Sequence, residues 1–213
     1  MFFIVVLTSR EVVHVDWRIG LLRWSLGVAF AMSTSKRKEE IQDGESYLKI
    51  IIAGEADVGK TALVNRYSTG RFDIPETIGL GFSSKTEKSA DLGQFKFSIW
   101  DMAGEERFRF ILPEVCRGAK GIMLLFDVSN PESFNHLVDW IGVIRECMGD
   151  IPVLLIEAKS DLESKIPEKS VRDFVRDKKL SGYMKVSAKQ DTNVKAAFQK
   201  ITELIEKDRR NVH

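Results

Sequence analysis

The sequence is poor in the features that mark several large classes of protein. Its 213 residues include only two cysteines, Cys116 and Cys147, and their separation matches neither a zinc cluster nor a redox pair. This excludes a disulfide framework and favours a reducing compartment. Neither sign of charge dominates, because 32 basic residues stand against 31 acidic ones. No overall field therefore attracts nucleic acid, and we expect no nucleic-acid partner.

Long apolar runs are also missing, even in the N-terminal tract, which differs most from the rest of the chain. Residues 2–7 and 17–32 are mostly apolar, but neither segment reaches the roughly 20 residues that a membrane span needs. Scattered charges disfavour a signal peptide. Two alternatives stay open: residues 17–32 form an anchor on a membrane surface, or the natural chain begins at Met32. Residues 33–46 are polar and predict a flexible leader, so residues 1–46 precede the folded domain.

From residue 47 onward the sequence alternates between buried strands and amphipathic helices. Apolar runs between turn residues predict strands, and apolar residues at helical spacing predict helices. One helix begins at Pro131, with Ser129 or Asn130 as its cap. The predicted strands are 47–53, 82–88, 94–101, 121–128, 153–156 and 183–186, and the predicted helices are 60–67, 131–148, 168–178 and 194–205. This order predicts an α/β fold of three layers, a mostly parallel six-stranded sheet with helices on both faces.

The strongest single motif directly follows the first predicted strand. Residues 54–61 read GEADVGKT and fit the pattern G-x-x-x-x-G-K-[ST]. The glycines let the backbone curl around phosphate oxygens, and the backbone amides at the start of the next helix point toward them. Lys60 then reaches the outer phosphates, and the hydroxyl of Thr61 binds Mg²⁺. The motif by itself fits an ATP-dependent kinase as well as a GTP-binding protein.

Four further motifs follow along the chain. They are Thr77-Ile78-Gly79, residues 100–108 (WDMAGEERF), Lys159-Ser160-Asp161 and Ser187-Ala188-Lys189. With these motifs, residues 47–207 resemble the Ras-superfamily small GTPases, and most closely the Rab-like branch. The resemblance implies a P-loop NTPase fold, with a G domain at 47–209 and a short tail at 210–213. It also implies a molecular switch that binds GTP or GDP with Mg²⁺ and hydrolyses GTP.

The same resemblance gives each motif residue a role. Thr77 and Asp101 join Thr61 around Mg²⁺, and Gly104 donates its amide to the γ-phosphate. Asp161 accepts hydrogen bonds from the two donors on the edge of guanine. The implied nucleotide-binding set is Gly54, Asp57, Val58, Gly59, Lys60, Thr61, Ala62, Phe72, Thr77, Gly104, Lys159, Asp161, Ser187, Ala188 and Lys189. The implied catalytic residues are Glu105, Lys60 and Thr77.

The chain departs from the family pattern at three positions. Ala158 stands where the family's base-recognition motif has asparagine, and the lost buried hydrogen bonds cost about 1–3 kcal/mol of affinity. Specificity for guanine is expected to survive through Asp161. Glu105 replaces the glutamine that orients the attacking water, so hydrolysis is slow or Glu105 acts as a base. Ala56 adds a methyl group near the γ-phosphate.

These departures leave three classes of function. The first is a GTP-hydrolysing switch in signalling or trafficking, the second a nucleotide-bound scaffold with little turnover, and the third an ATP-dependent kinase. Lys159 and Asp161 disfavour the kinase. For a switch we expect a cytoplasmic monomer, with membrane contact through the N-terminal tract as an alternative location. Effectors, activators and exchange proteins are expected at the mobile loops and the apolar stretch 108–112. No C-terminal cysteine offers a prenylation site.

Overall fold

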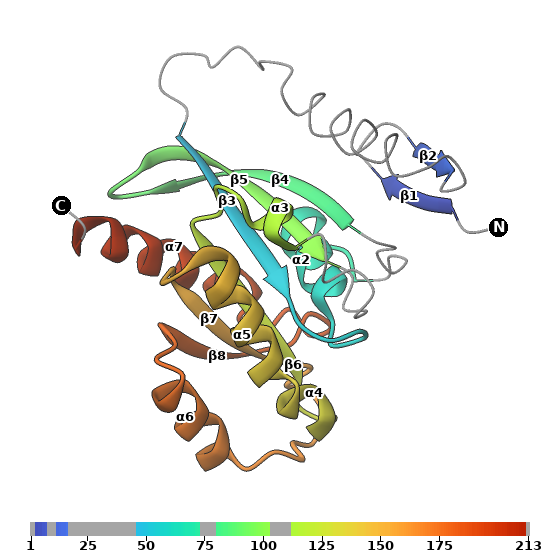
Figure 1. Ribbon diagram of the computed structural model, residues 1–213, viewed down its shortest axis with the longest axis vertical. Coiled ribbons are helices and arrows are strands. Elements are labelled where there is room, and N and C mark those ends of the chain that lie inside the picture. The colour runs from blue at the N-terminus through green and yellow to red at the C-terminus, as the bar shows by residue number, and fades with distance from the viewer. Residues whose placement is uncertain (1–2, 8–11, 17–45, 73–79, 103–111, 212–213) are drawn as a thin grey trace.

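The computed structural model describes residues 3–7, 12–16, 46–72, 80–102 and 112–211 (Figure 1). A six-stranded sheet in the order β4-β5-β3-β6-β7-β8 forms the centre of the fold. β4 (Leu80–Ser89) pairs antiparallel with β5 (Gly93–Met102), whereas all other neighbours pair in parallel. The remaining strands are β3 (Ser46–Ala53), β6 (Gly121–Asp127), β7 (Val153–Ala158) and β8 (Gly182–Val186). The predicted six-stranded, mostly parallel sheet is confirmed, and the antiparallel pair β4–β5 makes it mixed.

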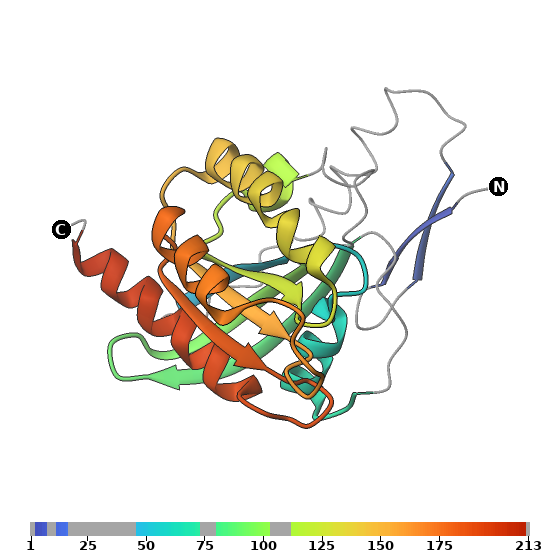
Figure 2. The same ribbon diagram turned by 90° about the horizontal axis from the view of Figure 1, so that it is seen from below.

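Helices cover both faces of this sheet, as the alternating pattern predicts. α2 (Lys60–Thr69) and α7 (Val194–Asn211) pack on one face, where Tyr67 and Phe198 stack with their ring centroids 3.6 Å apart. The opposite face carries α3 (Leu112–Cys116), α5 (Leu137–Met148) and α6 (Glu168–Asp177). Figure 2 shows α5 and α7 on opposite sides of the strands. Because β6 and β7 are buried on both faces, their sequences are almost continuously apolar.

The loops that carry the motifs meet at one edge of the sheet. Parallel strands end on the same side, and their register aligns those ends: Ala53 pairs with Leu124, and Ala158 pairs with Val186. β3 leads there into the phosphate loop, while β7 and β8 lead into the Lys-Ser-Asp and Ser-Ala-Lys segments. Motifs that are far apart in the sequence therefore lie together.

The helix predicted at 131–148 is interrupted in the structure. α4 (Pro131–Asn135) and α5 are separated by His136, whose ψ of −7° is far from the value of about −42° that is typical of an α-helix. The amide of His136 still donates to the carbonyl of Glu132 at 3.0 Å, so helical hydrogen bonding continues across the break, in agreement with the unbroken apolar spacing. Of the two predicted caps, the structure shows Asn130, whose side-chain oxygen accepts from the Glu132 amide at 3.1 Å.

Two short strands near the N-terminus were not predicted. β1 (Phe3–Leu7) and β2 (Val12–Asp16) pair antiparallel, with Phe3 opposite Asp16. The proposed anchor at 17–32 and the alternative start at Met32 lie outside the described residues, so both stay predictions. Among the helices that the structure describes, none is long and apolar enough to cross a lipid bilayer.

Gly54 is a position where the fold tolerates no side chain. Its φ is 137°, and a Cβ atom there would lie 2.3 Å from the carbonyl oxygen of Leu125. We expect Gly54→Ala to lower the free energy of unfolding by about 2–4 kcal/mol, measured by urea denaturation. Gly142→Ala is the matched control, because a Cβ there meets nothing within 4 Å and α5 should gain up to about 1 kcal/mol. Equal stabilities of the two variants would contradict this reading.

Candidate nucleotide-binding site

The phosphate loop is a tight turn between β3 and α2. Gly54, Asp57 and Gly59 have positive φ angles of 137°, 60° and 100°, a region that glycine adopts at little cost. Gly59 is the N-cap of α2 and has no side chain to satisfy the first helical amides. Those amides and the helix dipole form the anion-binding end that the motif predicts.

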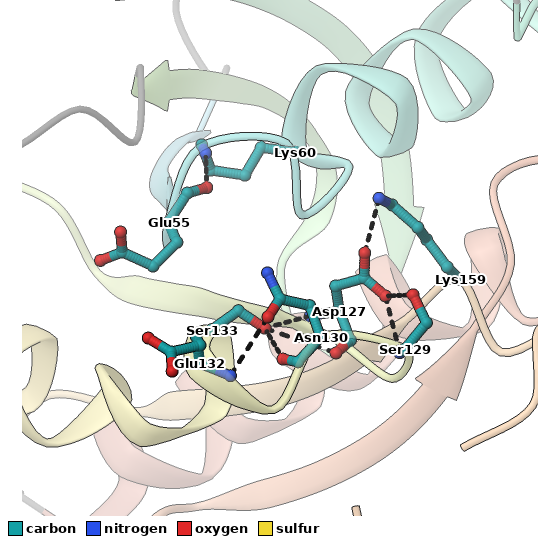
Figure 3. A network of polar contacts seen from close by, with 8 residues as sticks. All are labelled: Glu55, Lys60, Asp127, Ser129, Asn130, Glu132, Ser133 and Lys159. Atoms are coloured by element: carbon teal, nitrogen blue, oxygen red, sulfur yellow. Dashed lines mark hydrogen bonds and ion pairs between the residues drawn. The ribbon is translucent and has the colours of Figure 1, made fainter. Parts of the chain in front are cut away.

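Lys60 lies over this loop and is only 6% exposed. Its ammonium group donates a hydrogen bond of 2.5 Å to the backbone carbonyl of Glu55, as Figure 3 shows. The contact holds the positive charge of Lys60 against the backbone of the loop.

Thr61 and Asp101 meet at the predicted metal position. The Thr61 hydroxyl donates to Oδ2 of Asp101 at 2.6 Å, and Asp101 is 3% exposed. Pairing of Ile52 with Asp101 brings the end of β5 beside the phosphate loop. A hydroxyl and a carboxylate are hard oxygen ligands, so this donor set fits Mg²⁺. The other predicted residues of the γ-phosphate side lie outside the described residues: Thr77, Gly104 and Glu105.

A cavity of about 180 Å³ adjoins the phosphate loop. Its lining is mostly apolar, with Asp161 and two lysines as its charged groups, which suits a flat base that has one polar edge. The lining residues are Val58, Gly59, Ala62, Leu63, Phe72, Leu125, Ile156, Ala158, Lys159, Asp161, Leu162, Val186, Ala188 and Lys189. A larger hollow of about 700 Å³ lies between β4, β5 and α7, but no predicted site residue lines it.

Ser187 lies beside Asp161 and orients it. The Ser187 side chain is completely buried, and its hydroxyl donates to Oδ1 of Asp161 at 2.5 Å. The same hydroxyl accepts a hydrogen bond of 3.0 Å from the amide of Gln190. Ser187 is absent from the cavity lining, so its contact with the site runs through Asp161. The carboxylate that is predicted to read the base is therefore fixed by a buried partner.

Lys159 forms an ion pair that the sequence did not reveal. Its Nζ lies 2.6 Å from Oδ2 of Asp127, the last residue of β6. Oδ1 of Asp127 accepts from the amide and the hydroxyl of Ser129, at 2.8 and 2.7 Å (Figure 3). Burial by itself would raise the pKa of Asp127, but the hydrogen bonds from Lys159 and Ser129 outweigh it and hold this pKa below its ordinary value. The one sequence signal was a carboxylate ending an apolar strand.

Arg66 is a second residue that sequence reasoning missed. It lies on α2, and its Nε and Nη2 donate to the carbonyl oxygens of Ala188 and Lys189 at 2.7 and 3.2 Å. Its guanidinium carbon lies 5.8 Å from the centre of the Phe72 ring. Arg66 thus connects α2 to two parts of the cavity lining, the Phe72 ring and the loop after β8. A basic residue in the last turn of a helix ordinarily indicates interaction with the helix dipole, so nothing in the sequence singled it out.

Comparison with known proteins agrees with this arrangement. The family model described as "Ras family" matches residues 49–207, which include all five sequence motifs. The chain belongs to the Ras family of small GTPases. As a member of this family it is a guanine-nucleotide-binding protein.

The GTPase is similar to several Rab proteins. It is 35% identical to Ras-related protein Rab-3 of Caenorhabditis elegans over 172 residues, which cover 77% of this chain and 76% of the relative. Identity to Ras-related protein Rab-3A of Homo sapiens is 35% over 178 residues, 79% of each chain. Identity to Ras-related protein Rab-11C of Dictyostelium discoideum is 33% over 165 residues, 75% of this chain and 73% of the relative. The predicted likeness to the Rab branch is confirmed.

The low pKa of Asp127 makes part of the stability of the GTPase sensitive to acid. Because this pKa lies below the ordinary value of 3.8, the contribution is fully present above that value and is lost as the pH falls through the lower, folded-state pKa. We expect Asp127→Asn to lower the free energy of unfolding by about 1–3 kcal/mol near neutral pH. Its stability should also fall less steeply than that of the native protein below about pH 4.

Urea denaturation over a pH series measures both effects. Asp150→Asn is the control, because Asp150 pairs with Arg145 at 2.8 Å but its side chain is 98% exposed. An exposed pair of this kind adds little to stability. Identical losses in the two variants would show that the Asp127–Lys159 pair adds no more to stability than an exposed pair does.

Proposed function

We propose that this GTPase is a cytoplasmic monomer that binds GTP and GDP with Mg²⁺, hydrolyses GTP and acts as a molecular switch in signalling or intracellular trafficking. One observation carries the proposal: Val58 and Gly59 belong both to the phosphate loop and to the lining of the cavity that contains Asp161. A nucleotide with its base in the cavity would extend its phosphates over the loop. Guanine offers the Asp161 carboxylate two donors on one edge, N1–H and N2–H₂, where adenine has an unprotonated ring nitrogen and a C–H, and this difference supports selection of guanine.

The reaction would be attack of water on the γ-phosphorus, with GDP and phosphate as products. Thr61 and Asp101 would hold Mg²⁺ together with Thr77, and the metal would neutralise charge on the phosphate oxygens. Lys60 would stabilise the charge that develops as the bond to the leaving oxygen breaks. Glu105 would accept a hydrogen bond from the attacking water, in the place where the family has glutamine.

The switch would act through two segments that join the sheet side by side. Leu80 at the start of β4 pairs with Met102 at the end of β5, so residues 73–79 and 103–111 connect to the same end of this hairpin. Close by, Phe82 is 43% exposed and lies edge-on to Trp100, with centroids 5.4 Å apart. We place effectors, activators and exchange proteins on these segments and this aromatic patch, because exposed apolar patches mark partner surfaces.

Ala158 supplies a test of base recognition. It is 6% exposed and lines the cavity, where asparagine would add hydrogen-bonding groups. We expect Ala158→Asn to tighten GDP binding about tenfold or more and to keep the preference for GTP over ATP. Asp161→Ala is the counterpart, which should abolish that preference. Competition of GTP and ATP against a fluorescent GDP measures both, and equal affinity of the native protein for ATP and GTP would refute guanine selection.

Hydrolysis is tested by single-turnover release of phosphate from protein loaded with GTP and Mg²⁺. We compare the native chain with Glu105→Gln and Glu105→Ala. The alanine variant should be slower by about a hundredfold, as expected for loss of a group that orients or deprotonates water. The Glu105→Gln variant should not show this loss of turnover, because an amide both donates and accepts hydrogen bonds.

Other outcomes assign the other functions. If none of the three proteins turns over while GTP stays bound, the nucleotide-bound scaffold replaces the switch. Transfer of the phosphoryl group to a small molecule instead of water would establish the kinase.

A further inference from the structure

The side chain of Glu55 connects the phosphate loop to helix α5. Its Oε1 accepts a hydrogen bond of 2.8 Å from the indole Nε1 of Trp140, which lies 85 residues later in the sequence. Its Oε2 lies 3.7 Å from Nδ1 of His136 at the start of the same helix. Figure 3 shows the Glu55 carboxylate directed away from Lys60 and out of the loop. The second residue of the loop is therefore held from outside the nucleotide site.

Trp140 is well suited to hold another residue in place. It is 1% exposed and is among the largest fully buried side chains of the GTPase. It packs in the core on the α5 side of the sheet, with Leu137 and Ile144. A buried indole N–H needs an acceptor, and a carboxylate makes this bond stronger than a neutral oxygen would. The indole thus gives Glu55 a strong hydrogen bond to a side chain that is fixed by its packing in the core.

The backbone of Glu55 contacts Lys60, one of the predicted catalytic residues. Its carbonyl oxygen accepts the 2.5 Å hydrogen bond from the ammonium group of Lys60. A single residue therefore contacts Trp140 through its side chain and Lys60 through its main chain. A displacement of Glu55 would move the acceptor that holds the lysine over the loop.

Neither neighbour of Glu55 in the loop places a side chain in the core. Gly54 precedes Glu55 with a φ of 137°, and a glycine restricts its own backbone less than any other residue. Ala56 and Asp57, which follow, are exposed. A contact from the side chain of Glu55 to a rigid part of the core supplies the constraint that these neighbours do not.

We propose that Trp140 is a positioning residue for the phosphate loop, and that its hydrogen bond to Glu55 slows the release of bound nucleotide. The inference rests on the proposed function, because it presumes that GDP binds at the loop. It adds to that function a residue on α5, outside the nucleotide site, that sets how long the nucleotide stays bound.

The test measures the rate of GDP release. The full chain is loaded with fluorescent GDP and Mg²⁺, and unlabelled GDP is added in excess. Trp140→Phe keeps an aromatic ring but removes the donor, and Glu55→Leu removes the acceptor. Both variants should release GDP about tenfold faster than the native chain or more, as expected for a lost hydrogen bond to a charged group. Glu55→Gln is the matched control, because it keeps an acceptor oxygen and should stay within about threefold of native.

Combining the substitutions separates a hydrogen bond from packing. If the two groups act through one bond, the double variant Trp140→Phe with Glu55→Leu releases GDP no faster than the faster single variant. If Trp140 acts only as a core residue, the two accelerations multiply. The Glu55 variants keep the test decisive should Trp140→Phe not fold, because the Glu55 side chain is 23% exposed and lies on a loop.

The outcomes distinguish this inference from the proposed function. A native chain that does not retain GDP contradicts the proposed function itself. A native chain that retains GDP overturns the positioning role if Trp140→Phe and Glu55→Leu release it at the native rate. The same conclusion follows if Glu55→Gln is as fast as Glu55→Leu, since the acceptor oxygen would then be irrelevant.

Discussion

Parallel pairing of β5, β3, β6, β7 and β8 is the constraint on which the candidate nucleotide site depends. It places the carboxyl ends of five strands along one edge, and residues at or just after these ends contribute different parts of the site. β3 can approach β6 closely there because Gly54 has no side chain to collide with Leu125. Position in the sheet, more than any single bond, brings an anion-binding loop and a base-sized cavity side by side.

Polar contacts from neighbouring elements then fix three of the segments that line or adjoin the cavity. Arg66 fastens the loop after β8 to α2, Asp127 fastens Lys159 to the end of β6, and Ser187 fastens Asp161. The asparagine that the family uses at position 158 is missing, so the alanine there contributes only apolar lining. The contacts that connect the elements around the cavity are accordingly ion pairs and hydrogen bonds from Arg66, Asp127 and Ser187.

Structural features could be predicted from the sequence wherever their signal lies within one contiguous segment of the chain. The phosphate loop is one contiguous motif, and the inner strands are recognisable because burial on both faces makes them apolar throughout. Likeness to the family supplied Asp161 and Asp101, whose chemistry is ordinary when each is viewed alone. Arg66, Asp127 and Trp140 were missed because each acts through a partner that only the fold brings near. The break at His136 was missed for the opposite reason, since the apolar spacing continues through it.

Two contributions to stability of opposite sign meet at Lys159. Its φ of 57° lies in the left-handed region, which an ordinary side chain adopts at a cost of roughly 1–2 kcal/mol. Glycine would relieve that strain, yet it would also delete the ammonium group that reaches Asp127. The ion pair therefore offsets the backbone strain, because loss of the ammonium group would leave the largely buried Asp127 carboxylate without its cationic partner. The position is a poor target for stabilising this GTPase by engineering, however unfavourable its backbone looks in isolation.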